Sequence, residues 1–448
     1  MSSGSSSNPV NAVLGKAHDR GIHLTARPFI LCFIAANFAF LTLAPGQVLR
    51  NFEFLLIISP IWLPIMLGYF SYHYWRIANR TEWLAKQEYI LLELRVPRDV
   101  RKTPLAMETV LASLQISPGE STWWKTIVEG RTRPWWSFEI VSLGGRVHLY
   151  VWTREGFRRG LESYFYAQYP GIEIVEATDY SREVDPSHDP YDMWGCEFKF
   201  NREDPYPLKT YVDFMKPDSP MAKPEEQVDP LAQVIEYIGS LSPKEQFWIQ
   251  ILVRVSKDEK YAPFTIRDEA KKVLEELRKE TVRKTSFVDA SGVTRESESF
   301  PNPTRGIQNT MEAIERKISK PLFDVGIRSV YLAPKENYQG SSVAHLISMW
   351  RPFSSETLNK LGITRWFATL DDWPWEDRKG HLQAHMRHGL VDAYRRRSYF
   401  AEPYRFPWMV MNTEELATLF HIPSSGVTTP SLPRIQSSTA EAPSNLPT

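Results

Sequence analysis

The stretch WWSFEIVSLGGRVHLYVW, residues Trp135–Trp152, contains the clearest fold signal in the chain. Two runs rich in β-branched and aromatic residues flank Gly144 and Gly145, and a two-glycine turn between such runs is typical of a β-hairpin. Apolar residues then recur at helical spacing over Glu155–Tyr169, and Ile172–Ala177 has the composition of another strand.

The residues before this hairpin complete the pattern. Glu88–Val96 is a β-rich apolar run, and Pro104–Leu114 has helical periodicity with proline at its first position. The order β-α-β-β-α-β is that of a ferredoxin-like plait, an antiparallel sheet with its helices on one face. We therefore predict a ferredoxin-like domain over residues 77–180.

A second pass of similar periodicity predicts an α/β domain over residues 193–421, again a ferredoxin-like plait. Its middle strands are separated by a helical insertion at residues 256–320. The expected strands are Gly195–Asn201, Leu208–Phe214, Glu245–Val255 and Leu322–Pro334, with Trp408–Met411 as a strand that could complete the plait. The expected helices are Pro230–Leu241, Ile266–Lys284, Ile307–Lys320 and Ser341–Trp350.

The C-terminal part of the chain contains a helix start and then a change of composition. Asn412 can cap a helix that has Glu415 at its third position, which is the pattern of a capping box. The residues that follow are rich in Pro and Ser with few apolar positions, so residues 422–448 are predicted to be a disordered tail.

Two uncharged apolar runs lie near the N-terminus, after a polar head at residues 1–26 that is expected to be disordered. Pro28–Ala44 would reach about 26 Å as a helix, and Phe54–Trp75 is long enough to span a hydrocarbon core of about 30 Å. Pro60 and Pro64 inside the second run are tolerated better in membrane helices than in soluble ones. We predict a two-helix transmembrane hairpin at residues 27–76; a cleaved signal peptide and a buried soluble hairpin are the alternatives.

Basic residues flank the hairpin on both outer sides, whereas only Arg50 lies between the two runs. Because cytoplasmic flanks are enriched in Lys and Arg, both termini and the folded domains are expected in the cytoplasm. Only two cysteines, Cys32 and Cys196, occur in 448 residues, which excludes a disulfide framework and suits a reducing compartment.

The overall charge is balanced, with 53 Lys and Arg against 53 Asp and Glu. A broad basic field of the kind that non-specific nucleic-acid binders use is therefore excluded. The chain also lacks the GxxxxGK[ST], HExxH, CxxC and GxSxG patterns, so the usual nucleotide, metalloprotease, redox and serine-hydrolase sites are not expected. We predict no catalytic, cofactor-binding or metal-binding residue.

Three groups of residues leave alternatives open. His381, His385 and His388 would lie on one face of a helix, where neighbouring imidazoles can share a zinc ion, but Leu382 stands where a zincin has its glutamate. Arg395–Arg397 could contact phosphate or complete a helix terminus. The third group could stack bases or pack a core; it consists of Trp123, Trp124, Arg131, Arg133, Trp135 and Trp136.

Several long phrases resemble one family of bacterial membrane proteins. They are YILLELRVPRDVRKTPLAMETVLASL, RPWWSFEIVSLGGRVHLYVWTREGF, ESYFYAQYPGIEIVEATDY, FDVGIRSVYLAPKENY, DAYRRRSYF, NTEELATLFHIPSS and APSNLPT. The resemblance runs from about Tyr89 to the end of the chain and is to an uncharacterised two-pass family of candidate-phyla bacteria. That family is similar to the membrane-anchored region that precedes the ATPase domain in conjugation and type IV secretion ATPases of the HerA/FtsK kind. In those ATPases NTEELA and a Pro-rich connector lead into the nucleotide-binding domain, and this chain is expected to lack that domain.

The resemblance implies a non-catalytic, membrane-anchored docking component that partners a separate ATPase, with homo-oligomers as a further possibility. A membrane-anchored metal-dependent hydrolase using His381, His385 and His388 is the alternative from another class. A DNA-contacting platform is the third hypothesis.

Overall fold

The computed structural model describes residues 45–97, 102–185, 190–215, 229–280, 284–288, 294–298, 302–370, 377, 379–423, 432 and 434–435, with isolated positions between 32 and 42. The predicted head at residues 1–26 and nearly all of the predicted tail at 422–448 lie outside the described residues. Contacts divide the chain into two compact units. The first contains Met1–Lys86, Ser121–Thr132 and Phe367–Met386, and the second contains Gln87–Glu120, Arg133–Trp366 and Arg387–Thr448.

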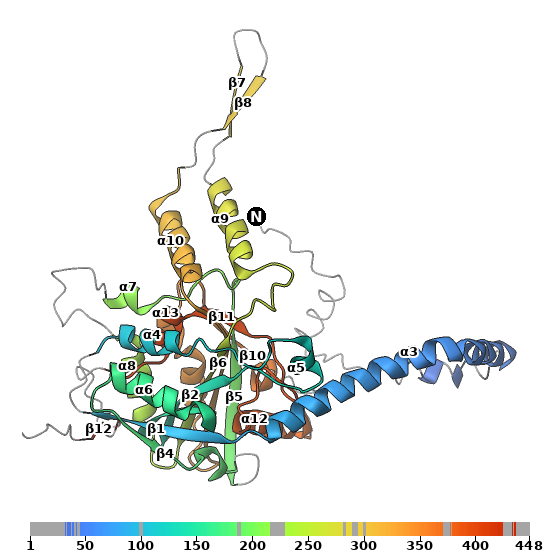
Figure 1. The fold of residues 1–448 in the computed structure, drawn as a ribbon, viewed down its shortest axis with the longest axis horizontal. Helices are drawn as coiled ribbons and strands as arrows, with labels where there is room; N and C mark the ends of the chain where they lie inside the picture. Colours follow the sequence, from blue (N-terminus) through green and yellow to red (C-terminus); the bar gives the residue numbers. More distant parts are fainter. Residues whose placement is uncertain are drawn as a thin grey trace, which may run out of the picture. The chain divides into compact units, whose positions relative to one another are not determined.

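The second unit is built on a ten-stranded sheet, shown in Figure 1. Along its main path the order is β10-β5-β9-β6-β2-β3-β1-β12, while β4 pairs with β1 and β11 pairs with β9. The strands are β1 (Tyr89–Pro97), β2 (Trp135–Leu143), β3 (Arg146–Arg154), β4 (Glu173–Glu176), β5 (Tyr191–Phe200), β6 (Gln246–Val255), β9 (Leu322–Pro334), β10 (Leu361–Thr364), β11 (Met409–Asn412) and β12 (Arg434–Ile435). The mixed α+β class predicted from the sequence is confirmed.

The strand order repeats in the two halves of the sheet. The order is β4-β1-β3-β2 in one half and β10-β5-β9-β6 in the other. If the strands of each half are numbered from the first strand of that half, both orders are 4-1-3-2. Antiparallel pairing of β2 with β6 joins the halves, from Trp135 opposite Arg254 to Leu143 opposite Gln246. The sequence predicts strands in both halves but not this junction, which places them in one sheet.

Helices cover one face of this sheet. They are α4 (Pro104–Ser113), α6 (Arg158–Gln168), α8 (Pro230–Gly239), α11 (Gly340–Ser348) and α13 (Thr413–Leu419). The ring of Phe138 on β2 lies 5.0 Å from that of Phe420, which follows α13, and Ser142 donates a hydrogen bond to the Ile238 carbonyl of α8 at 2.6 Å. Because side chains alternate along a strand, Ser137, Glu139 and Val141 face the other side of the sheet.

The helical insertion is confirmed. It leaves the sheet after β6 and returns at β9 as an arm of two helices, α9 (Ile266–Glu280) and α10 (Arg305–Ser319), visible in Figure 1. Ala270, Val273 and Leu274 of α9 pack against Ile314 of α10. Between these helices lie β7 (Lys284–Val288) and β8 (Thr294–Glu298), which pair antiparallel with each other.

Two strand predictions are wrong. Leu208–Phe214 does not form a strand, because Thr210 donates its N–H to Asp213 at 3.0 Å and begins the short helix α7 (Tyr211–Met215). The fourth strand of the second half is β10 beside β5, not the segment near Trp408. That segment does form β11, which instead pairs with the first residues of β9.

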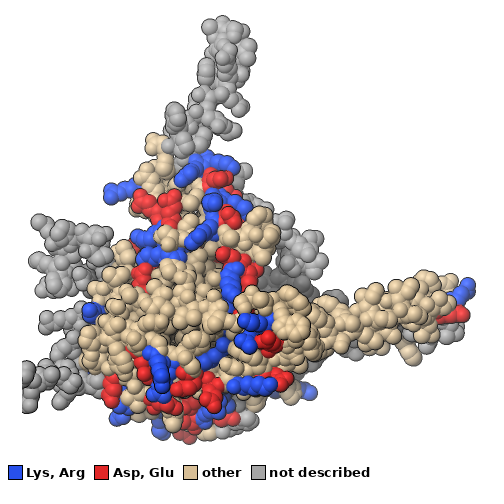
Figure 2. All heavy atoms as spheres, in the orientation of Figure 1, with Lys and Arg blue, Asp and Glu red and all other residues tan. Residues whose placement is uncertain are grey.

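The first unit contains α3 (Pro45–Ala85), a helix with Pro60 and Pro64 inside it. The predicted second span, Phe54–Trp75, lies within α3, and Leu56–Ala85 is long and apolar enough to cross a membrane. The predicted first span, Pro28–Ala44, lies outside the described residues apart from isolated helical positions. Figure 2 shows α3 as a surface almost without charge along most of its length.

Candidate functional site

A row of polar residues crosses the centre of the sheet on the face opposite the helices. Neighbouring strands place Glu197 opposite Arg328, Arg328 opposite Gln250, and Gln250 opposite Glu139. The row continues through Tyr150 to Glu93. Residues paired directly across strands share one face, so six strands contribute one side chain each to this polar row.

Arg397 closes the row at Glu139. Its Nε lies 3.0 Å from one Glu139 carboxylate oxygen, and its Nη1 lies 2.6 Å from Asp179. Tyr180 donates to the other Glu139 oxygen at 2.9 Å and meets the hydroxyl of Tyr394 at 2.6 Å. Burial opposes the charged form of Asp179, but the ion pair with Arg397 outweighs it and lowers the pKa of that carboxyl.

A second buried carboxylate, Glu197, lies at the other end of the row. Its oxygens are 3.2 Å from Arg328 and 3.2 Å from Arg365, and Trp366 donates its indole N–H. Burial raises the pKa of the Glu197 carboxyl although both arginines oppose this shift. Glu139, Glu197 and Arg328 are completely enclosed. Arginine therefore balances the charge of Glu139 and Glu197 inside the protein.

Segments after β10 cover the polar row. The C-terminal residues of α12 (His381–Arg395) lie across the polar row. Leu390 packs on Gly195, and the ring of Tyr394 approaches that of Trp248. Tyr399 packs on Gly326 of β9. Because glycine has no Cβ, these two positions let the covering segment approach the sheet closely.

Replacing Gly326 by alanine is expected to lower the free energy of unfolding by roughly 1–3 kcal/mol. A Cβ at this position would lie 2.5 Å from the ring of Tyr399, closer than non-bonded carbons approach. Gly306 in the first turn of α10 is the control, because a Cβ there meets nothing within 4 Å and G306A should raise stability by about 0.5–1 kcal/mol. Urea denaturation of the detergent-solubilised full chain measures both; equal effects would contradict the close packing of Tyr399.

The exposed end of the polar row should make stability depend on pH. His148 Nδ1 lies 2.6 Å from Glu93, and this hydrogen bond is the main cause of the lowered pKa of the Glu93 carboxyl. A carboxyl whose pKa is lowered by folding stabilises the fold at pH values above about 4.3, which is its pKa in the unfolded chain. This stabilisation is lost as the pH falls through the pKa of the folded protein. The free energy of unfolding should therefore decrease as the pH is lowered below about 4.3. E93Q should remove roughly 1 kcal/mol of this pH-dependent change in stability. E356Q, at an exposed carboxyl, is the control and should titrate like the parent protein.

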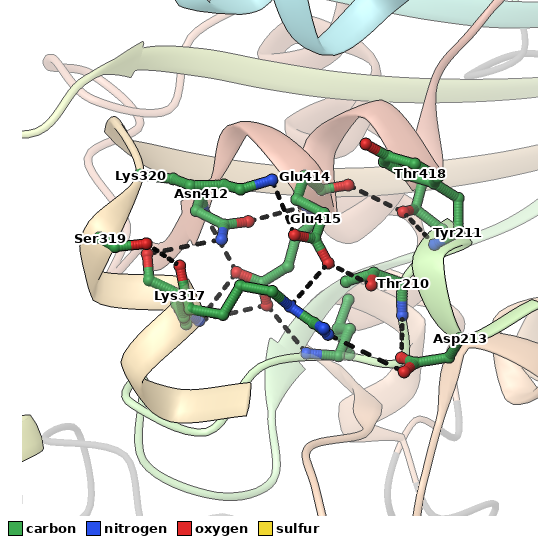
Figure 3. Close-up of polar contacts among 12 residues, drawn as sticks. Thr210, Tyr211, Asp213, Lys317, Ser319, Lys320, Asn412, Glu414, Glu415 and Thr418 are labelled. Atoms are coloured by element: carbon green, nitrogen blue, oxygen red, sulfur yellow. Dashed lines mark hydrogen bonds and ion pairs between the residues drawn. The ribbon is translucent and has the colours of Figure 1, made fainter. Parts of the chain in front are cut away.

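A second buried network surrounds the start of α13 and is drawn in Figure 3. Asn412 accepts from the Glu415 N–H at 2.8 Å, and Glu415 accepts from the Asn412 N–H at 3.0 Å, which confirms the predicted capping box. Glu415 also pairs with Lys317 of α10 at 3.0 Å, and both side chains are fully enclosed. Burial raises the pKa of the Glu415 carboxyl although Lys317 opposes that shift.

The neighbouring residue Glu414 extends this α13 network. Lys320 lies 2.8 Å from Glu414 and 2.7 Å from Glu108 of α4, while Arg316 lies 3.3 Å from Glu414. Thr210, just before α7, donates to Glu414. The α13 network therefore ties the base of the α9–α10 arm to two helices of the body and to the segment before α7.

The structure places the three histidines of the metal hypothesis on exposed positions of α12. His381 and His385 belong to the first unit, and His388 belongs to the second. Among the described residues, no group of three or more His, Cys, Asp or Glu side chains has a geometry that could hold a metal ion.

The arginine run has different environments at each position. Arg395 donates to the carbonyls of Ser181 and Val184 at 3.0 Å, and Arg396 is an exposed partner of Asp392. Arg397 is buried in the polar row, so it is not available to contact phosphate in this structure.

The tryptophan pairs also differ. Trp135 and Trp136 are buried in β2, whereas Trp123 and Trp124 are exposed on α5 (Trp123–Ile127) in the first unit. Arg131 pairs with Glu129, and the buried Arg133 pairs with Glu120 at 2.6 Å. The six residues therefore do not form one surface for stacking bases.

A hollow of about 510 Å³ lies beside the edge strand β10. Arg351, Ser355, Glu356 and Lys360 contribute to its lining, and Glu356 pairs with Lys360. It contains no buried, unpaired acid or base of the kind that a catalytic site uses.

The sequence analysis missed the polar row and the partners of the α13 network. One signal was present: Glu139, Gln250 and Arg328 each interrupt an otherwise apolar β-run. A charged or amide group in such a run needs a buried partner. The sequence does not show which partner, because the cross-strand register is set only when distant strands pair.

A family described as Domain of unknown function (DUF8128) matches residues 78–434. No curated protein matches the chain. The matched region contains the sheet up to the first residue of β12, both buried networks and the α9–α10 arm.

Proposed function

The chain belongs to the DUF8128 family, and we propose that it is a non-catalytic, membrane-anchored docking component that partners a separate ATPase of the HerA/FtsK kind. The observation that carries the proposal is the exposed apolar surface of α3. Large apolar side chains such as Ile57, Ile61 and Ile65 are exposed on this helix, which would be costly in water and is favourable in a bilayer.

The interior of the second unit supports a structural role. Three of its buried carboxylates are paired with arginine or lysine: Glu139 with Arg397, Glu197 with Arg328, and Glu415 with Lys317. A catalytic acid or base needs access to a substrate and a pKa suited to proton transfer. Fully enclosed ion pairs instead specify one arrangement of the chain.

The finer membrane arrangement is part of the proposal. Pro28–Ala44 would form the first of two spans and α3 the second, in a bacterial plasma membrane with both termini and the folded units in the cytoplasm. The 4-1-3-2 strand order in each half of the sheet supports reading the matched region as two ferredoxin-like plaits joined edge to edge.

We assign partner binding to the α9–α10 arm. Its inner side is apolar, and its base is tied to the body through Lys317 and Lys320. The outer side of α9 has exposed charges, including Lys271 and Lys272. A charged surface on an arm whose base is fixed to the rest of the unit suits electrostatic recognition of another protein.

Membrane anchoring can be tested in bacterial cells that express the full chain. It should resist alkaline carbonate extraction, and a cysteine at the exposed position Glu356 (E356C) should be protected from an impermeant maleimide until the cells are permeabilised. In I61R/I65R each arginine adds about 2.5–3.5 kcal/mol to the free energy of inserting α3, because it lies at the centre of the span. This variant should therefore not be both retained in the membrane and protected from the maleimide. L105R, at an exposed position of α4, is the control and should change neither result. Release of the parent chain by carbonate would refute the anchor, and labelling in intact cells would refute the orientation.

Docking is tested with the detergent-solubilised full chain and a purified ATPase of the HerA/FtsK kind. The two should co-elute in size-exclusion chromatography, and K271E/K272E should weaken the complex at least tenfold. E356Q, outside the arm, is the control. Separate elution of the parent chain and the ATPase at micromolar concentrations would refute this partner.

A further inference from the structure

The exposed tryptophans of α5 have an unusual position in the first unit. Among the described tryptophans outside α3, only Trp123 and Trp124 are exposed, at 67% and 53%. Their rings lie 5.6 Å apart and nearly perpendicular. A pair of large aromatic side chains left in water is unfavourable unless another surface covers it.

Specific contacts attach α5 to α3. Asn79 of α3 donates its side-chain N–H to the carbonyl of Val128 at 3.0 Å and to that of Ile127 at 3.4 Å. Gly130 lies directly on the α3 backbone, since a Cβ there would be 2.4 Å from the carbonyl carbon of Asn79. Its φ of +66° is in the left-handed region that favours glycine, so this close approach needs that residue.

The attachment point lies just beyond the apolar part of α3. The uncharged run Phe54–Trp75 would reach about 33 Å at 1.5 Å per residue, which matches the hydrocarbon core. Asn79 is four residues further, about 6 Å along the axis. The headgroup region begins at this depth, and Tyr72, Tyr74 and Trp75 at the end of the run are exposed aromatic side chains.

We propose that Trp123 and Trp124 insert into the headgroup region of the bilayer and form, with the aromatic end of α3, an interfacial anchor that holds the first unit against the membrane. Tryptophan favours this region because its ring is apolar and its indole N–H can hydrogen-bond. Arg76 and Lys125 lie in the same two helices and would favour anionic lipids. This proposal rests on the proposed membrane span of α3.

The experiment measures the depth of a nitroxide label in full chains reconstituted into phosphatidylcholine vesicles containing phosphatidylglycerol. C32S removes the exposed native cysteine, and Cys196 is buried and should not react. Labels are placed singly by W123C, W124C, I65C and E356C. Collisions with oxygen, which concentrates in lipid, and with a water-soluble nickel chelate report depth.

The label at position 65 should lie in the hydrocarbon core, those at 123 and 124 at the interface, and that at 356 in water. If the label at 65 is in the core but those at 123 and 124 are as accessible to nickel as that at 356, the anchor is refuted and the span stands. If the label at 65 is also in water, the span itself is refuted and the anchor with it.

A second measurement keeps the native side chains. Brominated lipids quench tryptophan fluorescence at short range, so the amount of emission that they quench should be smaller in W123F/W124F than in the parent chain. W135F, in the buried β2, is the control and should leave the quenched emission unchanged. An equal quenched emission in W123F/W124F and the parent would count against interfacial insertion.

Discussion

Replacing Arg397 by alanine is expected to lower the free energy of unfolding by about 3–5 kcal/mol, the usual cost of removing one partner from a buried ion pair. Arg397 is the cation for both Glu139 and Asp179, with contacts of 3.0 Å and 2.6 Å. Gln250 and Tyr180 would still donate to Glu139, but neither carries a charge. Two carboxylates would remain with their main counter-ion removed.

The neighbouring arginine is a matched control. Arg396 is 58% exposed and pairs with Asp392 one helical turn earlier, so R396A should cost no more than about 0.5 kcal/mol. R397K should recover only part of the loss, because lysine cannot contact both carboxylates with a planar fork. Urea denaturation of the full chain in detergent measures all three. Similar losses for R397A and R396A would show that the polar row does not depend on its central cation.

Replacing Lys317 by methionine should have a comparable effect, about 3–5 kcal/mol, at a different place. Lys317 and Glu415 are 3.0 Å apart and both fully enclosed. Without the lysine, Glu415 must be buried without a counter-ion or take up a proton. The cost should therefore be smaller at pH 5 than at pH 8, because burial already raises the pKa of Glu415.

A double substitution separates the charge effect from loss of packing. E415Q keeps the capping box, since glutamine can replace glutamate at this helix position, and K317M/E415Q should therefore recover most of the stability lost in K317M. K272M is the control, because Lys272 is exposed and its ion pair is with Glu269 on its own helix. If K317M/E415Q is as unstable as K317M, packing of the lysine stem, and not the lost ion pair, would explain the effect.

The two networks also bear on the hypotheses drawn from the sequence. The run at 395–397 has the sequence pattern of a basic helix end, and one member of it, Arg397, is buried and pairs with Glu139 of the polar row. NTEELA reads as a capped helix, which is correct, but the same glutamates also hold the base of the insertion. In each case a local pattern was visible and its distant partner was not.

Local periodicity was sufficient for most of the elements. The hairpin at Trp135–Arg154, the long strand β9 and the helices α4, α8, α9 and α10 are where the apolar spacing places them. The misplaced strand at Leu208–Phe214 and the missed β10 are short segments. Over a few residues an alternating pattern is weak, and one side-chain hydrogen bond such as that of Asp213 decides the conformation.

The sequence by itself determined the apolar helix, the α+β class, the helical insertion and the capped last helix, because each depends on residues close together in the chain. Tertiary structure alone decided that β2 pairs with β6, that six strands align their polar residues in one row, and that Arg397 and Lys317 meet their carboxylates. These features depend on cross-strand register and on contacts between residues far apart in the chain, such as Lys317 with Glu415 at a separation of 98. A buried charge shows in sequence that a partner is required, and only the folded chain shows which residue provides it.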